Sequence, residues 1–271
     1  DGIRDSVASR GLGDVYKRQD SARISALDPI EFVVAATVMF AGGVVLSVSS
    51  FGIGLVASPI YLLFLDTQSV VVTVNAVGGI LLAVILSKSR QHVSIRQMSP
   101  AVIGGVVGAP IGVFSLTLVD PGDLRIGIAG MVLILAVVSA LDFQLRIPKA
   151  RILAAPVGFA TSILVTSMSI GGPFMVIYLL NWLKIRQAVR ASMALFYLGL
   201  STSAMLAYWV AGLYTLERLT LIAVVTVPGV LGVLVGSRLT RNLSERLFRR
   251  LVIAFISTTS VIVLAREIVP L

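Results

Sequence analysis

From residue 30 onward, long apolar blocks alternate with short polar segments. Two blocks, 30–65 and 151–183, are too long for one membrane crossing, and each contains a break rich in Gly, Ser and Pro. We predict that each is a helical hairpin that turns inside the membrane. The remaining blocks are close to the ~20 residues that cross a bilayer as a helix, and they cover about 69–87, 100–119, 124–141, 188–213, 218–237 and 247–268.

Composition supports a membrane protein. The chain has 271 residues, of which 57% are hydrophobic and 13% are charged, whereas soluble domains carry about 25% charged residues. The formal net charge is +9, but the basic residues lie in short loops between apolar blocks, as orientation in a membrane requires. We therefore expect the lipid bilayer, and no nucleic acid, as a partner. Cysteine is absent, which excludes disulfides and thiolate chemistry.

The first 28 residues differ from the rest. They are polar, include five Lys or Arg residues and lack the apolar stretch of a signal peptide. Their segment GLGDVYKRQ resembles translated sequencing-adapter read-through. We predict that residues 1–28 are a disordered or non-native tail.

The distribution of Lys and Arg predicts the topology, because cytoplasmic loops carry an excess of both. Loops 88–99, 142–151, 184–190 and 238–250 together hold fourteen, whereas the intervening loops hold two, Arg125 and Arg218. We place the four basic loops in the cytoplasm of a multi-pass protein of a bacterial plasma (inner) membrane. Block 151–183 must then leave and return to the same side, and block 30–65 does so from the other side. The five basic residues of the tail oppose an outside N-terminus unless the tail is foreign.

This reasoning predicts an all-α integral membrane fold of two inverted repeats, 29–145 and 146–271, each a broken hairpin followed by three transmembrane helices. Weak sequence matches occur in the same order in both halves. The matching pairs are the breaks Ser50–Pro59 and Thr166–Pro173, the tetrapeptides VNAV (74–77) and VRAS (189–192), and the four-residue spacings Gly104/Gly108/Gly112 and Pro228/Gly232/Gly236.

Inverted repeats with broken helices are typical of secondary transporters. A break at lipid depth survives only when it is buried in protein or lines a wet cavity. The N–H groups freed at the start of the second half-helix favour an anion. All 13 carboxylates lie in the tail or near block ends, so none is available to bind a cation at mid-span. We expect a small anionic substrate.

The candidate substrate-binding residues are small, hydroxyl, amide or basic, and nearly all lie at the two breaks. They are Ser50, Gly52, Gly54, Ser58, Pro59, Asn75, Ser167, Ser169, Gly171, Gly172, Pro173 and Arg190. Alternatives stay open: the glycines could serve only tight helix packing, the serines could bond to their own helices, and Arg190 could be only an orientation charge. Asn75 lies in an otherwise apolar span and must have a partner.

Enzymatic and metal chemistry are disfavoured. No His, Cys or carboxylate lies within a span to act as a base, nucleophile or ligand. His92, the single histidine, is in a basic loop. Gly52-Ile-Gly54 lacks the strand context of a dinucleotide site. We expect no catalytic residues, no metal and no cofactor.

The motifs SFGIGLVASP (50–59), SIGGPFMVIYLL (169–180) and VRAS (189–192) resemble the TauE/SafE sulfite exporter family, within the four-TMS permease superfamily. The likeness runs along most of residues 30–268. It implies a permease for sulfite, sulfoacetate or other sulfonates, built from two inverted halves whose motif residues line a central site. This chain departs from the family pattern at two points, which weaken the substrate assignment more than the family assignment. The family often has a third glycine in the first motif, and it more commonly has threonine at the position of Ser192.

We therefore expect a secondary transporter of small anions, such as sulfite, sulfonates or related organic anions, acting as an exporter by alternating access. A passive anion channel of the same architecture is the alternative, and a scaffold without substrate is a third reading. A homo-oligomer is compatible with each.

Overall fold

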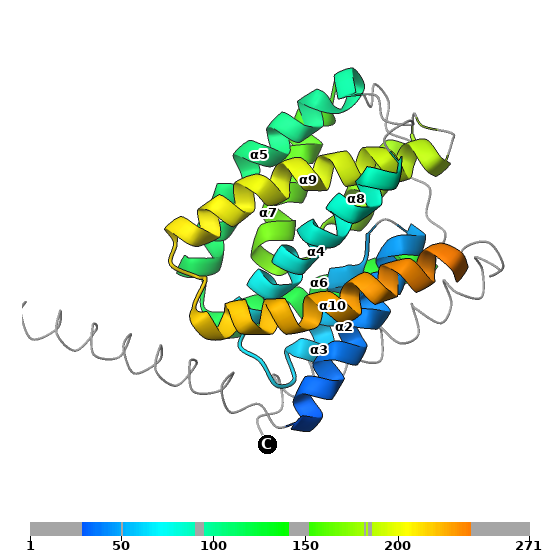
Figure 1. The fold of residues 1–271 in the computed structure, drawn as a ribbon. Coiled ribbons are helices and arrows are strands. Elements are labelled where there is room, and N and C mark those ends of the chain that lie inside the picture. Colours follow the sequence, from blue (N-terminus) through cyan, green and yellow to red (C-terminus); the bar gives the residue numbers. More distant parts are fainter. Residues whose placement is uncertain are drawn as a thin grey trace, which may run out of the picture.

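The computed structural model describes residues 29–49, 51–89, 95–140, 152–181, 183 and 186–239 (Figure 1). Within them the secondary structure is helical. The helices are α2 (Pro29–Ser49), α3 (Ile53–Tyr61), α4 (Thr67–Ser89), α5 (Ile95–Leu118), α6 (Pro121–Ala140), α7 (Ala154–Met168), α8 (Gly172–Leu180), α9 (Arg186–Val210) and α10 (Leu216–Leu239). The tail 1–28, loop 142–151, most of loop 238–250 and the predicted span 247–268 lie outside the described residues.

Block 30–65 forms a hairpin of α2 and α3. Ile53, at the start of α3, packs against Gly42 of α2. At the other end of α3, the Tyr61 hydroxyl donates a hydrogen bond to the Ala35 carbonyl at 2.8 Å. The chain therefore runs back along α2, as the length of the block predicted.

Block 151–183 breaks in the same way between α7 and α8. Ser169 takes a left-handed conformation with φ 59°, and Gly171 folds back against Val165 and Thr161 of α7. Pro173 follows in the first turn of α8, where a missing N–H leaves no helical bond unmade.

Both breaks are shorter than the sequence suggested. Ser58 and Pro59 lie inside α3, and Thr166 and Ser167 lie inside α7. Proline is tolerated within helices at membrane depth because neighbouring groups satisfy the backbone that it frees. Among the described residues, the non-helical positions of the two breaks are 51–52 and 169–171.

The order of helices in the first half recurs in the second. α8 begins 119 residues after α3 (172 against 53), and α9 begins 119 residues after α4 (186 against 67). Both α3 and α8 have 9 residues. The match of VNAV with VRAS implies an offset of 115 residues (189 against 74), four fewer, which is about one helical turn.

The glycines at four-residue spacing join the two halves. On α5, Gly104 packs against the Ala155 carbonyl of α7, and Gly112, about two turns later, packs against Ile163 of the same helix. On α10, Gly232 packs against the Phe40 carbonyl of α2, and Gly236 packs against Val44 of the same helix. Small residues at this spacing let helix backbones approach closely. Each half thus packs its fourth helix along the first helix of the other half, in parallel.

The helix ends that adjoin the four basic loops lie at one end of the bundle. α5 is parallel to α7 and also to α9, since the Ser203 hydroxyl reaches the Val106 carbonyl and Gly199 contacts Val102. α4 is parallel to α10, because Arg218 near the start of α10 reaches Ser69 near the start of α4. It is antiparallel to α9, because Gly79 faces Ser201 while Asn75 and Tyr208 both reach the end of α7. α7 consequently begins at this end, whereas α2 begins at the opposite end.

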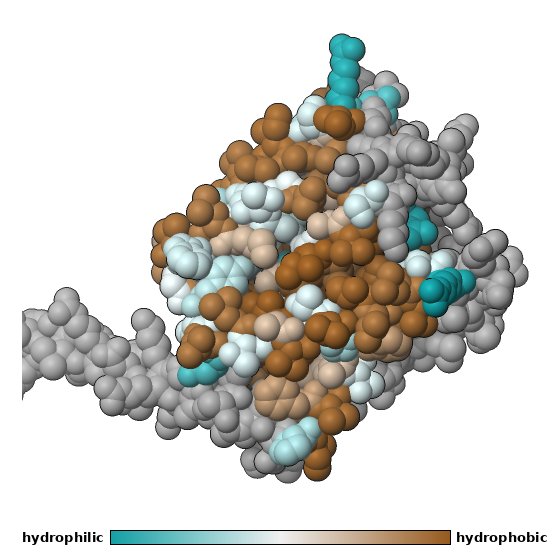
Figure 2. Space-filling view, in the orientation of Figure 1, coloured by the Kyte–Doolittle hydropathy of each residue, from teal (hydrophilic) through white to brown (hydrophobic). Residues whose placement is uncertain are grey.

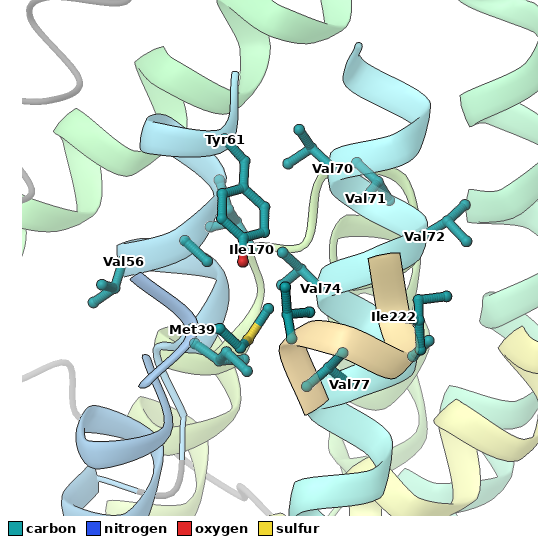
Figure 3. Packing of buried hydrophobic residues seen from close by; sticks show 14 of the residues in the cluster. Met39, Val56, Tyr61, Val70, Val71, Val72, Val74, Val77, Ile170 and Ile222 are labelled. Atoms are coloured by element: carbon teal, nitrogen blue, oxygen red, sulfur yellow. The ribbon is translucent and has the colours of Figure 1, made fainter. Parts of the chain in front are cut away.

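Each break inserts one apolar side chain into the core of the other half. Ile170, from the second break, is 1% exposed and belongs to the core cluster formed largely by α2, α3 and α4; Figure 3 shows it near Tyr61. Phe51, from the first break, packs against the cluster formed largely by α7, α8 and α9. The two breaks are therefore held in place by each other's cores.

The outer surface is that of a multi-pass membrane protein. Five described helices, α2, α4, α5, α9 and α10, are long and apolar enough to cross a bilayer. Large apolar side chains such as Phe114, Trp209 and Val227 are more than half exposed. Figure 2 shows that the visible face of the described helices is predominantly apolar.

Candidate functional site

The two breaks meet in the interior of the bundle. A β-carbon added to Gly54 of α3 would overlap the backbone carbonyl of Ser169 in the second break. One added to Gly172 of α8 would lie 2.5 Å from Cβ of Phe51 in the first break. Each hairpin thus uses a glycine to admit the backbone or side chain of the other.

A cavity of about 30 Å³ lies at this junction. Such a volume has room for the centres of about two water molecules. Residues 51–55 and 169–173 form much of its wall, and α4 and α9 supply most of the rest, including Asn75, Gly78, Gly79, Tyr197 and Ser201. Leu46 of α2 and Val165 of α7 complete it. None of the described residues that line the cavity has a charged side chain. Among the described residues, no group of three His, Cys, Asp or Glu side chains could hold a metal ion.

The starts of α3 and α8 both face the cavity without a capping side chain. Gly52, which precedes α3, has φ 99°, a left-handed conformation that glycine adopts readily. Gly171 precedes α8, and neither residue can offer a side-chain hydrogen bond. The first N–H groups of a helix lack partners within the helix and carry partial positive charge. Two such ends therefore line one cavity.

The C-terminal ends of α2 and α7, unlike the N-terminal ends of α3 and α8, are capped by side chains. In each case the donor comes from the opposite half of the chain. The Asn75 amide nitrogen of α4 lies 3.0 Å from the Val165 carbonyl of α7 and 3.1 Å from the Ser169 hydroxyl. A guanidinium nitrogen of Arg190 in α9 donates to the Ser47 carbonyl of α2. Helix C-termini carry partial negative charge, so these donors offset it at both breaks.

Seven of the predicted residues line the cavity, namely Gly52, Gly54, Asn75, Ser169, Gly171, Gly172 and Pro173. Four do not. Ser58 and Pro59 lie within α3, the Ser167 hydroxyl bonds to the Ile163 carbonyl of its own helix at 2.7 Å, and Arg190 holds the end of α2. Ser50 lies outside the described residues.

Two polar cavity residues, Tyr197 and Ser201, are absent from the sequence prediction. They lie four residues apart on α9 and therefore on one face of the helix. This spacing is the signal that could have found them. Thr202 and Ser203 lie beside Ser201 in sequence, however, and hydropathy alone does not say which hydroxyl faces inward.

The family comparison covers this architecture from α2 beyond α10. Residues 34–263 match the model of the family described as sulfite exporter TauE/SafE. The chain belongs to this family. Membership identifies it as an exporter-type membrane transporter. No curated protein and no solved structure matches the chain significantly.

Proposed function

We propose that this TauE/SafE family member is a secondary transporter that exports small anions, such as sulfite, sulfonates or related organic anions, through the cavity between the two breaks. The arrangement of helix ends carries the proposal. Two uncapped N-termini, those of α3 and α8, face the cavity, while Asn75 and Arg190 offset the C-termini of α7 and α2. The cavity is left with an excess of hydrogen-bond donors, which suits an anion.

We further propose that residues 29–145 and 146–271 are inverted repeats that move against each other to give alternating access. Supporting this are the recurring helix order and the exchanged packing of α5 on α7 and α10 on α2. The hairpins also begin at opposite ends of the bundle. Transporters of this design bind substrate at the repeat interface. The excess of Lys and Arg supports a cytoplasmic location for loops 88–99, 142–151, 184–190 and 238–250.

Binding and transport test this function separately. Purified full-length protein is screened by thermal shift against sulfite, thiosulfate, sulfoacetate, taurine and acetate, because a ligand that binds the folded state raises apparent stability. We expect the sulfur oxyanions to raise the melting temperature. No shift with any anion would contradict the proposed substrate class.

Counterflow in proteoliposomes then tests the mechanism. Vesicles preloaded with unlabelled sulfite should accumulate ³⁵S-sulfite transiently, and the flux should saturate with concentration. Linear flux without trans-stimulation would instead indicate a passive channel. Asn75→Asp, which places a carboxylate in the cavity wall, serves as the impaired variant.

A further inference from the structure

Two hydroxyl groups on α9 face the cavity without a hydrogen-bond partner in the described part of the chain. Tyr197 and Ser201 both line the cavity, and neither hydroxyl oxygen is completely buried. Their hydroxyls are therefore accessible from the cavity. A β-carbon on Gly172 would lie 3.0 Å from the Tyr197 oxygen, which places that phenol beside the start of α8.

Other hydroxyls on the same helix are used differently. Thr202 bonds to the Leu198 carbonyl at 2.9 Å, Ser203 to the Val106 carbonyl at 2.8 Å and Tyr208 to the Thr166 carbonyl at 2.7 Å. A polar group inside a membrane protein ordinarily finds such a partner. Other hydroxyls of the described residues also lack a partner, among them those of Ser58, Thr73 and Tyr214, but these residues do not line the cavity. Tyr197 and Ser201 differ because they lie one helical turn apart at the cavity wall, where a ligand can use them.

We propose that Tyr197 and Ser201 are specificity-determining residues whose hydroxyls donate hydrogen bonds to a multi-oxygen oxyanion. This inference rests on the proposed function, because it concerns the same cavity. The donors come from separate walls: the first N–H groups of α3, the Gly172 N–H at the start of α8, and the two α9 hydroxyls. An anion with three or four oxygens, such as sulfite or sulfate, offers acceptors in several directions at once. A monatomic halide cannot reach all of these donors together.

The described residues that line the cavity are all uncharged, which strengthens the argument. Without a full positive charge, affinity depends on the number of well-placed neutral donors. A hydrogen bond to a charged group contributes more than one between neutral groups. Losing one hydroxyl should therefore weaken oxyanion binding about 10-fold, with a much smaller effect on chloride.

The experiment measures the Kd of sulfite, sulfate and chloride by calorimetry on the full chain and on Tyr197→Phe and Ser201→Ala. Tyr214→Phe and Thr202→Ala are the matched controls. The Tyr214 hydroxyl is buried away from the cavity and has no hydrogen-bond partner among the described residues, and that of Thr202 bonds to its own helix. Both cavity substitutions keep or reduce side-chain volume, and melting temperatures without ligand verify folding.

We expect the cavity variants to lose about 10-fold in oxyanion affinity and less than about twofold in chloride affinity, while the controls bind as the wild type does. If the wild type binds sulfite or sulfate and both cavity variants bind them equally well, the inference is overturned while the proposed function stands. An equal loss for chloride would overturn the assignment of specificity. Failure of the wild type to bind any oxyanion would overturn the proposed function itself.

Discussion

Gly54 of α3 lies so close to Ser169 that a β-carbon on the glycine would overlap the serine's backbone carbonyl oxygen. The two residues belong to different halves of the chain and are 115 positions apart (169 against 54). Ser169 also occupies the left-handed region, with φ 59°. The contact therefore fixes the relative position of the two breaks and, with it, the shape of the cavity.

Gly54→Ala should separate the breaks. The added methyl group has to displace backbone rather than a flexible side chain, and overpacking of this kind costs about 1–3 kcal/mol. We expect a lower melting temperature in detergent and a reduced rate of sulfite counterflow. Gly130→Ala on α6 is the matched control, because nothing lies within 4 Å of its added β-carbon. Equal behaviour of the two variants would show that the close approach of the breaks is unimportant.

Asn75→Leu removes the donor that links α4 to the end of α7. The amide nitrogen contacts the Val165 carbonyl at 3.0 Å and the Val71 carbonyl at 2.9 Å. Hydrogen bonds between membrane helices contribute about 0.6–2 kcal/mol, so the melting temperature should fall by a few degrees. Asn75→Gln keeps the amide and should recover part of the loss. A fully stable Asn75→Leu protein would contradict a linking role.

Arg190→Gln distinguishes a substrate ligand from a helix cap. Arg190 contacts the Ser47 carbonyl and does not line the cavity. We expect a lower melting temperature with the Kd of sulfite changed by less than about threefold, because removing a cation from a helix C-terminus loses favourable dipole interaction. Arg96→Gln, at an exposed position near the start of α5, controls for the loss of one positive charge. A large loss of sulfite affinity confined to Arg190→Gln would instead assign the residue to the substrate path.

The sequence was sufficient to predict the two hairpins. Basic loops flank block 151–183 at both ends, so both ends of the block must lie on the same side of the membrane. The sequence also located most of the break residues, since glycine next to hydroxyl residues is rare in apolar helices. The limits of the breaks were wrong at Pro59, which lies inside α3, and at Thr166, which tertiary contacts hold inside α7. The Thr166 hydroxyl, for example, reaches the Ala109 carbonyl of α5 at 3.1 Å. Such contacts leave no local pattern in the sequence.

Tyr197, Ser201 and Arg218 show a second limit of sequence reasoning. Each is one polar residue in or beside a span, and its role depends on which neighbour it faces. From loop composition, Arg218 is only one of the two basic residues on the sparsely charged side. In the structure it is 7% exposed and joins the start of α10 to the start of α4.

The Arg218 guanidinium is held by four groups, and it links the two halves at the end of the bundle opposite the basic loops. Its Nε donates to the Ser69 hydroxyl at 2.8 Å, and one terminal nitrogen donates to the Leu213 carbonyl at 3.0 Å. The other terminal nitrogen lies 3.3 Å from the Asp66 carboxylate and 3.4 Å from the Gln68 side-chain oxygen. The Asp66 side chain is 14% exposed, so little solvent screens the pair.

Arg218→Leu should therefore be among the most destabilising single changes at this end of the bundle. It leaves the Asp66 carboxylate without its counter-charge, and breaking a buried pair in this way costs about 3–5 kcal/mol. For a chain of this size we expect the melting temperature to fall by roughly 10 °C. The neighbouring Glu217→Gln is the control for a charge change at the same helix start. In the double variant Asp66→Leu/Arg218→Leu no unpaired charge remains, so it should melt above Arg218→Leu alone. If the double variant instead melts lower by the sum of the two single effects, the residues act independently and the ion pair does not join the halves.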